Sequence, residues 1–177
     1  MTGPPHDFYC TPDRLAWRMI GAIGDNCRPA RVADFAAGDG KLLKIAEENW
    51  PDSSYVAVDI SKPAVDKLRR WWPHWHIGRC DFLVDRSRRR TAALRSLEGE
   101  VDVVLLNPPF SCRGKKYFEV DAGERVFRCG RAMAFVLTSF RYLATDGILV
   151  AVLPNGCLVS DKDAPAWEWL RRSYTYR

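Results

Sequence analysis

The sequence predicts an α/β fold in which helices flank a mostly parallel sheet. The clearest sign is the continuous apolar run over 101–106, which is rich in β-branched residues and typical of a strand buried on both faces. Strand and helix patterns also alternate along the chain without an internal repeat, as in α/β proteins. In addition, Asp34, Asp59, Asp81 and Asn107 lie at the carboxyl ends of successive predicted strands, where open α/β sheets bind ligands.

Local signals place the individual elements along the chain. Thr11 is expected to cap a first helix with Pro12 at its first position, and Ser61 is expected to cap a later helix whose first turn contains Pro63. Asp146-Gly147 is expected to turn the chain into the last full strand. Strands are predicted over 31–36, 55–60, 76–83, 101–106 and 148–153; helices are predicted over 41–49, from about 124 to 143 and from 164, with another strand beginning near 173.

Length and composition limit the classes of function. The 177 residues, 47% hydrophobic and 28% charged, suit one domain with a sizeable core. The longest apolar run falls well short of the roughly 18 residues of a membrane span, and the first residues do not read as a signal peptide. The six cysteines are scattered, which favours a reducing cytoplasm, argues against zinc and predicts that most of them are small core residues.

The chain is basic, with a formal net charge of +5 and a pI near 9.0. Part of the excess lies over 86–90, where four arginines surround one serine, and Arg95 follows shortly after. Such a cluster could attract the phosphates of a nucleic acid, and it could equally be a solvated loop and first helical turn.

The segment Asn107-Pro108-Pro109-Phe110 directly follows the strand predicted over 101–106. Each proline fixes its own φ and lacks an N–H, and each keeps the residue before it extended. The predicted result is a rigid polar corner at the carboxyl end of a central strand. A strand exit without chemistry is the alternative, and the companion motifs at Gly38-Asp39-Gly40, Asp59 and Asp81 argue against it.

A glycine-rich turn, Gly38-Asp39-Gly40, follows the strand predicted over 31–36. The position three after Gly40 is Leu43, so the dinucleotide fingerprint and a nicotinamide-dependent oxidoreductase are disfavoured. Asp59 comes 19 residues after Gly40, at the end of the next strand, where an acidic side chain can accept hydrogen bonds from both hydroxyls of a ribose. The alternative for Asp59 is a partner for the following helix N-terminus.

Asp81 and Phe82 end the strand predicted over 76–83. Asp81 could accept a hydrogen bond from the exocyclic amine of a nucleobase, with Phe82 as an apolar wall, although a single Asp at a strand end is most often a turn former. Asp81 supports a ligand site because Asp34, Asp59 and Asn107 are likewise predicted at carboxyl ends of strands.

Taken together and in order, these segments resemble the S-adenosylmethionine-dependent amino-methyltransferases, particularly the adenine-N6 DNA methyltransferases. The resemblance covers about residues 8–158. Asp34 to Gly40 resembles D-P-x-C-G-x-G, with Phe35 and Ala37 in place of the common Pro and Cys. The other matching segments are Phe8-Tyr9-Cys10-Thr11-Pro12, Asp59, Cys80-Asp81-Phe82, Asn107-Pro108-Pro109-Phe110 and the strand from Gly147 to Gly156.

The resemblance implies a Rossmann-like methyltransferase fold that lacks its last hairpin, and S-adenosylmethionine as cofactor. Asn107 Oδ1 and the Pro108 carbonyl would accept hydrogen bonds from the target amine, Pro109 would stiffen the corner and Phe110 would stack on the base. No metal is required, because the sulfonium is already an activated electrophile. The positions implied to bind the cofactor are Tyr9, Thr11, Pro12, Asp34, Ala36, Gly38, Gly40, Asp59, Ile60, Asp81 and Phe82.

The leading Phe-x-x-Thr-Pro element favours N6 of adenine in duplex DNA as the target. In a duplex the base would first have to be flipped out of the helix. Relatives with similar motifs methylate adenine or guanine in RNA, or glutamine in proteins. Residues 1–177 are expected to form one methyltransferase domain, with a cofactor-binding part at about 8–85 and a catalytic part at about 100–160. No target-recognition domain is visible, which suggests a fragment, a chain that relies on a partner subunit, or a decayed copy.

A different class of function is a catalytically idle module that keeps this scaffold. It would hold nucleic acid or a protein partner through the basic cluster and the tryptophans Trp71, Trp72 and Trp75. Aromatic residues at the end of a helix are more often part of the core or a lid than a stacking platform. Binding of S-adenosylmethionine separates the two classes, because the enzyme must bind it.

Overall fold

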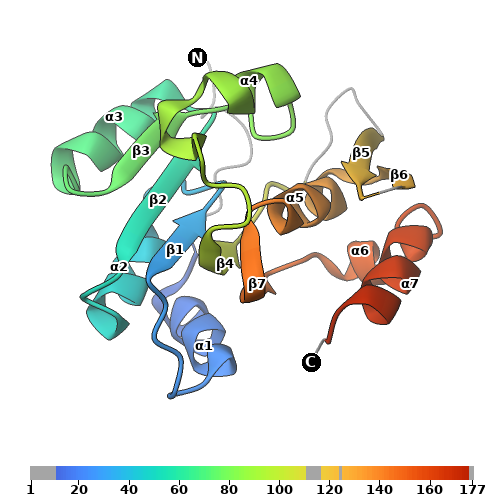
Figure 1. Cartoon of the computed structure of the whole chain (residues 1–177), viewed down its shortest axis with the longest axis horizontal. Helices are drawn as coiled ribbons and strands as arrows, with labels where there is room; N and C mark the ends of the chain where they lie inside the picture. Colours follow the sequence, from blue (N-terminus) through green and yellow to red (C-terminus); the bar gives the residue numbers. More distant parts are fainter. Residues whose placement is uncertain (1–10, 111–116, 124, 176–177) are drawn as a thin grey trace, which may run out of the picture.

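In the computed structural model, which describes residues 11–110, 117–123 and 125–175, a parallel sheet forms the centre of the protein (Figure 1). Its strands are β1 (Arg31–Asp34), β2 (Ser54–Asp59), β3 (His76–Arg79), β4 (Val101–Leu106) and β7 (Leu143–Ala151), in the order β3-β2-β1-β4-β7. The helices are α1 (Asp13–Ile23), α2 (Lys41–Asn49), α3 (Lys62–Trp71), α4 (Asp85–Arg90), α5 (Arg131–Phe140), α6 (Asn155–Val159) and α7 (Ala164–Ser173), with a 3₁₀ turn over Ala92–Leu94.

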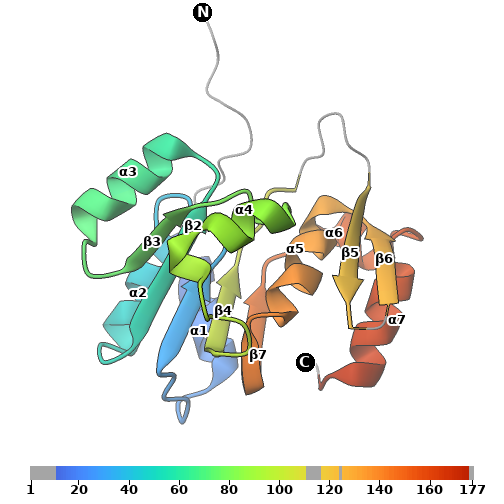
Figure 2. The ribbon, with the colours of Figure 1, turned by 45° about the horizontal axis from the view of Figure 1, so that its top comes forward.

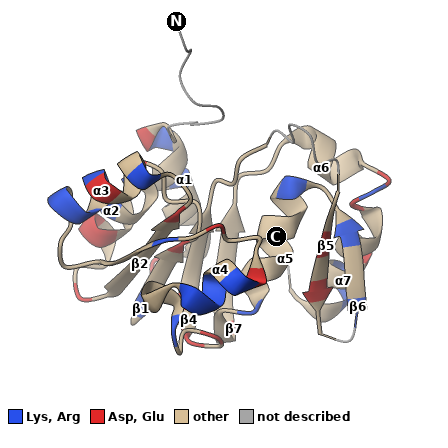
Figure 3. Cartoon of the chain, turned by 90° about the horizontal axis from the view of Figure 1, so that it is seen from above, with Lys and Arg blue, Asp and Glu red and all other residues tan. Residues whose placement is uncertain are grey.

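Alternate side chains of the sheet strands enter two separate cores. Val32, Val103 and Leu105 pack with apolar residues of α1, α2 and α3 on one face. Val104 and Leu106 pack with α5 and the 3₁₀ turn on the other. Figure 3 shows α1, α2 and α3 on one side of the strands and α4 on the other. Burial on both faces explains why β4 reads as a continuous apolar run.

Several predicted boundaries are confirmed and others shift by a few residues. Ser61 caps α3, since its side chain accepts a hydrogen bond from Ala64 N. β3 ends at Arg79, so the segment from Cys80 to Leu83 is a turn instead of strand. β7 begins at Leu143, five residues before the predicted start, and Asp146 adopts a positive φ of 64° where the pairing with β4 shifts register.

The helix predicted from about 124 to 143 is wrong in its first part. Residues Arg125–Cys129 form β6, which pairs antiparallel with β5 (Phe118–Ala122), and α5 begins only at Arg131. Val126, whose spacing from Met133 and Leu137 fits one apolar face of the predicted helix, is 65% exposed, whereas Phe127 and Cys129 are buried. Their alternation has the period of a strand, and the partner strand that stabilises it lies outside the predicted helix.

The β5–β6 hairpin lies apart from the main sheet, beside α5 and α7 (Figure 2). The ring of Phe127 on β6 packs 5.4 Å from that of Trp169 on α7, which ties the last helix to the hairpin. Tyr174 is extended, as the predicted beginning of a strand would be, but its ring packs on Phe140 at 4.3 Å. Among the described residues it joins no sheet.

The tryptophan group after α3 is mainly a packing feature. Trp72 and Trp75 stack at 4.6 Å with nearly parallel rings, and Trp75 is only 5% exposed. Trp75 Nε1 donates a hydrogen bond to Glu47 on α2. Trp71 is 58% exposed, and Lys67 lies 4.7 Å above its ring. Two of the three rings therefore pack internally, which is not the arrangement of a stacking platform.

Candidate functional site

Three of the predicted site residues come to the same edge of the sheet. Asp34 ends β1, Asp59 ends β2 and Asn107 directly follows β4. The three strands are parallel neighbours, with Asp34 paired to Ala57 and Ala33 paired to Val104. Their carboxyl ends therefore form one polar edge of the sheet.

The glycine-rich turn after β1 is tied to β2 by backbone hydrogen bonds. Gly38 N donates to Asp59 Oδ2 at 2.8 Å, and Ala37 N donates to Val58 O at 3.0 Å. Gly38 and Gly40 have φ values of 54° and 81°, in the left-handed region that glycine adopts without penalty. A Cβ on Gly40 would lie 2.6 Å from Leu68 Cδ2, so the turn also needs glycine for close packing on α3.

The aspartates at the ends of β1 and β2, and the one shortly after β3, make the same local hydrogen bond. In each, Oδ1 accepts from the backbone N–H two residues later: Asp34 from Ala36 at 2.9 Å, Asp59 from Ser61 at 2.7 Å and Asp81 from Leu83 at 3.3 Å. This geometry is that of a local turn, so the turn-forming interpretation accounts for one oxygen of each carboxylate. The second oxygen distinguishes Asp59 from Asp81. Asp59 Oδ2 accepts a hydrogen bond from Gly38 N, whereas Asp81 Oδ2 has no hydrogen-bond partner in the described part of the chain.

Asp34 is the most buried of these carboxyls, with an exposed fraction of 1%. Burial raises its pKa to about 7, and the nearby carboxylates of Asp59 and Asp39 add to the rise, while the hydrogen bond from Ala36 opposes it. Asp34 therefore changes charge near neutral pH.

Asn107 contacts a residue near the beginning of the described part of the chain. Its Nδ2 donates a hydrogen bond to Thr11 Oγ1 at 3.0 Å, across 96 residues of sequence. Thr11 is buried, and the structure makes Pro12 the N-cap and starts α1 at Asp13, one residue later than predicted. Pro12 itself is exposed. The Thr11 hydroxyl thus lies at the candidate site and orients the Asn107 amide.

The other end of the Asn107 amide lacks a hydrogen bond. Asn107 Oδ1 is buried, and it has no hydrogen-bond partner among the described residues. A buried carbonyl oxygen without a partner costs about 1–3 kcal/mol, so such a group in a folded protein needs an explanation. Pro108 is buried beside it, while Pro109 and Phe110 are partly exposed. The rigid corner predicted from the sequence therefore presents a fixed, unsatisfied acceptor.

Phe82, the predicted apolar wall, packs inside the protein. It is 2% exposed, and its ring stacks on Phe35 at 4.4 Å and packs near Tyr142. The ring therefore belongs to the core, and its contact with a ligand stays a prediction. The exposed apolar residues nearby are Ile60, which is 60% exposed at the end of β2, and Val84, which is 47% exposed after β3.

Sequence reasoning missed the residues that hold the turn after β3. Asp81 N donates to Ser87 Oγ at 2.9 Å, and Arg88 Nη1 donates to Phe82 O at 2.6 Å. Both anchors lie on α4, inside the basic run that was interpreted as a phosphate-binding cluster or a solvated face. Arg88 is thus a structural residue, which the run of arginines alone does not reveal.

The remaining sequence predictions concern the cysteines, metal ligands and membrane spans. Tyr9, Cys10 and Cys112 lie outside the described residues. The described cysteines are free, and Cys80, Cys129 and Cys157 are buried, as expected of core residues. No metal-ligand cluster of His, Cys, Asp or Glu occurs among the residues described, and within the same ranges no helix has the length and apolar character to cross a bilayer.

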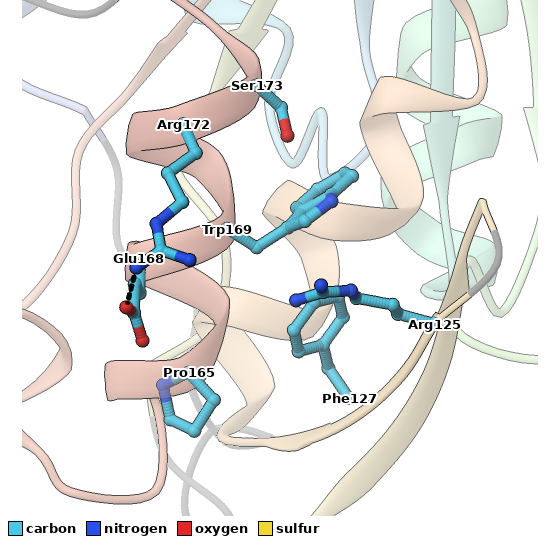
Figure 4. Close-up of a pocket in the computed structure, with 7 residues that line it drawn as sticks. All are labelled: Arg125, Phe127, Pro165, Glu168, Trp169, Arg172 and Ser173. Atoms are coloured by element: carbon cyan, nitrogen blue, oxygen red, sulfur yellow. Dashed lines mark hydrogen bonds and ion pairs between the residues drawn. The ribbon is translucent and has the colours of Figure 1, made fainter.

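A cavity of about 320 Å³ lies between β6 and α7 (Figure 4). Its lining residues all follow the predicted site residues in the sequence. Trp169, Phe127 and Arg125 line it, and Arg172 on its rim pairs with Glu168. None of the predicted catalytic or cofactor-binding residues contributes to this cavity.

Comparison with known proteins identifies relatives over short segments. Over 93 residues the chain is 33% identical to ribosomal RNA large subunit methyltransferase G of Pseudomonas syringae, covering 52% of this chain and 24% of the relative. Over 60 residues it is 33% identical to tRNA1(Val) (adenine(37)-N6)-methyltransferase of Vibrio parahaemolyticus, covering 33% of this chain and 25% of the relative. The matched segments thus span about a quarter of these curated relatives.

Solved structures share the fold at low sequence identity. The methyltransferase subunit of a type I restriction-modification system from Streptococcus thermophilus superposes with a TM-score of 0.69 at 19% identity, over 94% of this chain and 39% of that one. Geranyl diphosphate C-methyltransferase from Streptomyces coelicolor gives a TM-score of 0.52 at 18% identity, over 79% of this chain and 44% of that one. The predicted Rossmann-like methyltransferase fold is confirmed.

The sequence profile of the methyltransferase small domain matches residues 19–156, which is most of the chain. This range contains the glycine-rich turn, Asp59 and Asn107. The predictions of an S-adenosylmethionine-dependent methyltransferase and of its cofactor are confirmed at the level of the family. The chain belongs to the methyltransferase small domain family of S-adenosylmethionine-dependent enzymes.

Proposed function

We propose that this domain methylates the exocyclic amino group of a purine base in RNA. The observation that carries the proposal is the buried Asn107 Oδ1, an acceptor held at the carboxyl edge of the sheet without a partner among the described residues. An exocyclic amine supplies the N–H that this oxygen lacks. RNA is favoured over DNA because the two relatives with similar sequence are named for ribosomal and transfer RNA, whereas the type I restriction-modification subunit is similar in fold only.

The residues at this edge fit S-adenosylmethionine as methyl donor. The turn from Asp34 to Gly40 would hold the methionine part, since its backbone approaches without Cβ atoms at Gly38 and Gly40. Asp59 would hold the ribose and Asp81 Oδ2 the adenine amine, with the exposed Ile60 side chain against the adenine face. The cofactor supplies an electrophilic methyl group on a sulfonium.

The role of Asn107 follows from the weakness of the nucleophile. The lone pair of an aromatic amine is delocalised into the ring, so the nitrogen attacks well only when it becomes pyramidal. Acceptors at Asn107 Oδ1 and the Pro108 carbonyl would bind its two N–H groups, favour that geometry and stabilise the positive charge that develops. The nitrogen then carries one proton too many, which passes to water because neither acceptor is basic enough to keep it.

The fold prepares the acceptor before a substrate arrives. Thr11 fixes the amide through Nδ2, and the two prolines limit movement of the backbone that carries it. In a paired region the target base must leave its stack to reach this corner, and Phe110 would then provide a ring for it to stack against.

Methyl incorporation from labelled S-adenosylmethionine tests the proposal, with total RNA, duplex DNA and protein offered in separate reactions. We expect label in RNA, located by nucleoside digestion on the amino group of adenine or guanine. Asn107→Ala should abolish it, while Asn49→Ala, at the exposed end of α2, should not. Label in DNA or protein alone, or equal labelling by the Asn107→Ala variant, would contradict the proposal.

A further inference from the structure

A groove of about 630 Å³ runs beside β3, the strand at one edge of the sheet. Four arginines from three elements line it: Arg69 from α3, Arg79 from β3, and Arg86 and Arg90 from α4. Apolar residues, among them Ile77 and Val84, also contribute to its lining. The lining of the groove combines four cationic side chains with apolar residues, and neither the family match nor the proposed catalytic corner accounts for it.

The four groove arginines differ from their neighbours in having no ion pair within the described ranges. On the same helix, Arg88 and Arg89 both pair with Asp85, which Arg141 also approaches at 3.6 Å. By contrast, Arg86 and Arg90 are unpaired, exposed and four residues apart, so both lie on one side of α4. Figure 3 shows α4 as a largely basic segment on this side of the sheet.

The other two groove arginines are positioned by the backbone and not by acids. Arg79 Nε donates to Ile60 O at 3.1 Å, and Arg69 Nη2 lies 3.5 Å from Ile77 O. Both arginines interact electrostatically with Asp66. The pKa of Asp66 is lowered chiefly by Lys62 and to a smaller extent by Arg69 and Arg79. Lys62 Nζ already bonds Asp66 at 2.6 Å. The groove therefore keeps a surplus of positive charge.

Close packing forms one wall of this groove. A Cβ on Gly78 would lie 2.4 Å from Thr91 Cγ2, so the absence of a side chain on β3 lets the segment after α4 approach. Thr91 Oγ1 lies within hydrogen-bond distance of Arg79 O and Ser87 O, which joins that segment to β3 and α4. The arginines are thus held together on a fixed surface although like charges repel.

We propose that this groove binds the phosphate backbone of the RNA strand that flanks the target base. The inference rests on the proposed RNA substrate and extends it to a second contact surface. Four arginines without an ion pair among the described residues, together with apolar residues in the same lining, suit a strand that carries regularly spaced phosphates between less polar sugars and bases. The link from Arg79 to Ile60, the residue after Asp59, joins the groove to the polar edge that carries Asn107.

The test is RNA binding by the full chain, measured by fluorescence anisotropy with a labelled single-stranded RNA over a series of salt concentrations. The groove variant is Arg86→Gln with Arg90→Gln. The matched control is Arg14→Gln with Arg18→Gln, two exposed arginines with the same four-residue spacing on α1. Unfolding temperature and S-adenosylmethionine affinity check that both variants fold.

We expect the groove variant to bind RNA roughly tenfold more weakly. The negative slope of log K against log salt should become shallower by about 1.4, since each lost phosphate contact on a single strand removes about 0.7 from its magnitude. The control should stay near the wild type. Equal losses in both variants, or an unchanged slope in the groove variant, would overturn the proposal; in the second case an acidic protein surface becomes the occupant to test.

This outcome is separable from that of the proposed function, because binding is measured without methyl transfer. RNA that binds through the groove but is never methylated would contradict the proposed reaction and leave the groove assignment intact. Methylation by the groove variant with unchanged kcat and raised KM for RNA would support both.

Discussion

Asp59 and Asn107 lie at the same edge of one sheet, and they differ in how far the protein satisfies their oxygen atoms. Both carboxylate oxygens of Asp59 accept backbone N–H groups, from Ser61 and from Gly38. The carbonyl oxygen of Asn107 accepts none from the described residues, although it is buried. Asp59 thus holds the neighbouring backbone in place, while Asn107 keeps an acceptor oxygen without a hydrogen bond from the described residues.

This difference indicates a division of labour along the edge. A carboxylate that already takes two backbone donors fixes the glycine-rich turn and retains lone pairs for ligand hydroxyls. An unsatisfied buried amide oxygen is costly in the free protein, and that cost is removed when an N–H donor arrives. We therefore expect changes at Asp59 to act on the turn and on cofactor binding, and changes at Asn107 to act on the chemical step.

The largest effect is expected at Asn107. Asn107→Ala should lower kcat by about 10³-fold, because it removes a positioned hydrogen-bond partner of the transition state. S-adenosylmethionine affinity, measured by calorimetry, should change less than twofold. Asn107→Asp, which keeps acceptor oxygens but cannot donate to Thr11, should retain more activity than the alanine variant. A parallel loss of cofactor binding in Asn107→Ala would remove the proposed distinction between the two residues.

A second effect is the pH dependence of stability caused by Asp34. Its folded pKa of about 7 lies above the unfolded value of about 3.9, so the folded state binds the proton more tightly between these values. Stability should be greatest below the unfolded pKa and fall as pH rises, by about 2.5 kcal/mol between pH 5 and 8. Urea unfolding of the wild type and Asp34→Asn measures this, and the asparagine variant should lose the slope. An identical slope in both proteins would assign it to other groups.

Asp59→Ala should weaken S-adenosylmethionine binding by roughly 10-fold to 30-fold, since it removes the acceptor of Gly38 N and the proposed ribose contact. Asp102 provides a matched control at the opposite end of the sheet, because its carboxylate also accepts two backbone N–H groups; Ala30 N and Arg31 N both donate to Oδ2, at 2.8 Å. Asp102→Ala should lower the free energy of unfolding about as much as Asp59→Ala does, without changing the affinity for S-adenosylmethionine. Calorimetry and thermal unfolding of both variants decide whether the Asp59 effect is local.

The polar edge could be predicted from the sequence because it depends on local rules. Buried strands show as apolar runs, parallel strands present the same ends together, and Asp34, Asp59 and Asn107 each stand where such a run stops. The unsatisfied oxygen could not be predicted, since it depends on how the amide of Asn107 is turned by Thr11, 96 residues away.

The errors have a common physical origin in contacts between distant segments. Val126 and Gly130 fit a helical stripe with α5, and only pairing with β5 decides that residues Arg125–Cys129 form a strand. The burial of Phe82 also depends on a distant segment, because its ring stacks on Phe35 inside the core. Likewise, the basic run on α4 separates into anchoring and unpaired arginines only once Asp85 and Phe82 O are in place.

The smallest effect, and the finest test of the comparison, is expected at Thr11. Thr11→Val keeps the shape of the side chain but removes Oγ1, the acceptor of Asn107 Nδ2. The amide then loses the contact that orients it, so kcat should fall about threefold to tenfold, equivalent to the roughly 1 kcal/mol of one neutral hydrogen bond. Thr11→Ser should recover most of this loss, and turnover of both variants at saturating cofactor and RNA measures it. A Thr11→Val variant that matched wild-type turnover would mean that the two prolines alone hold Asn107 in place.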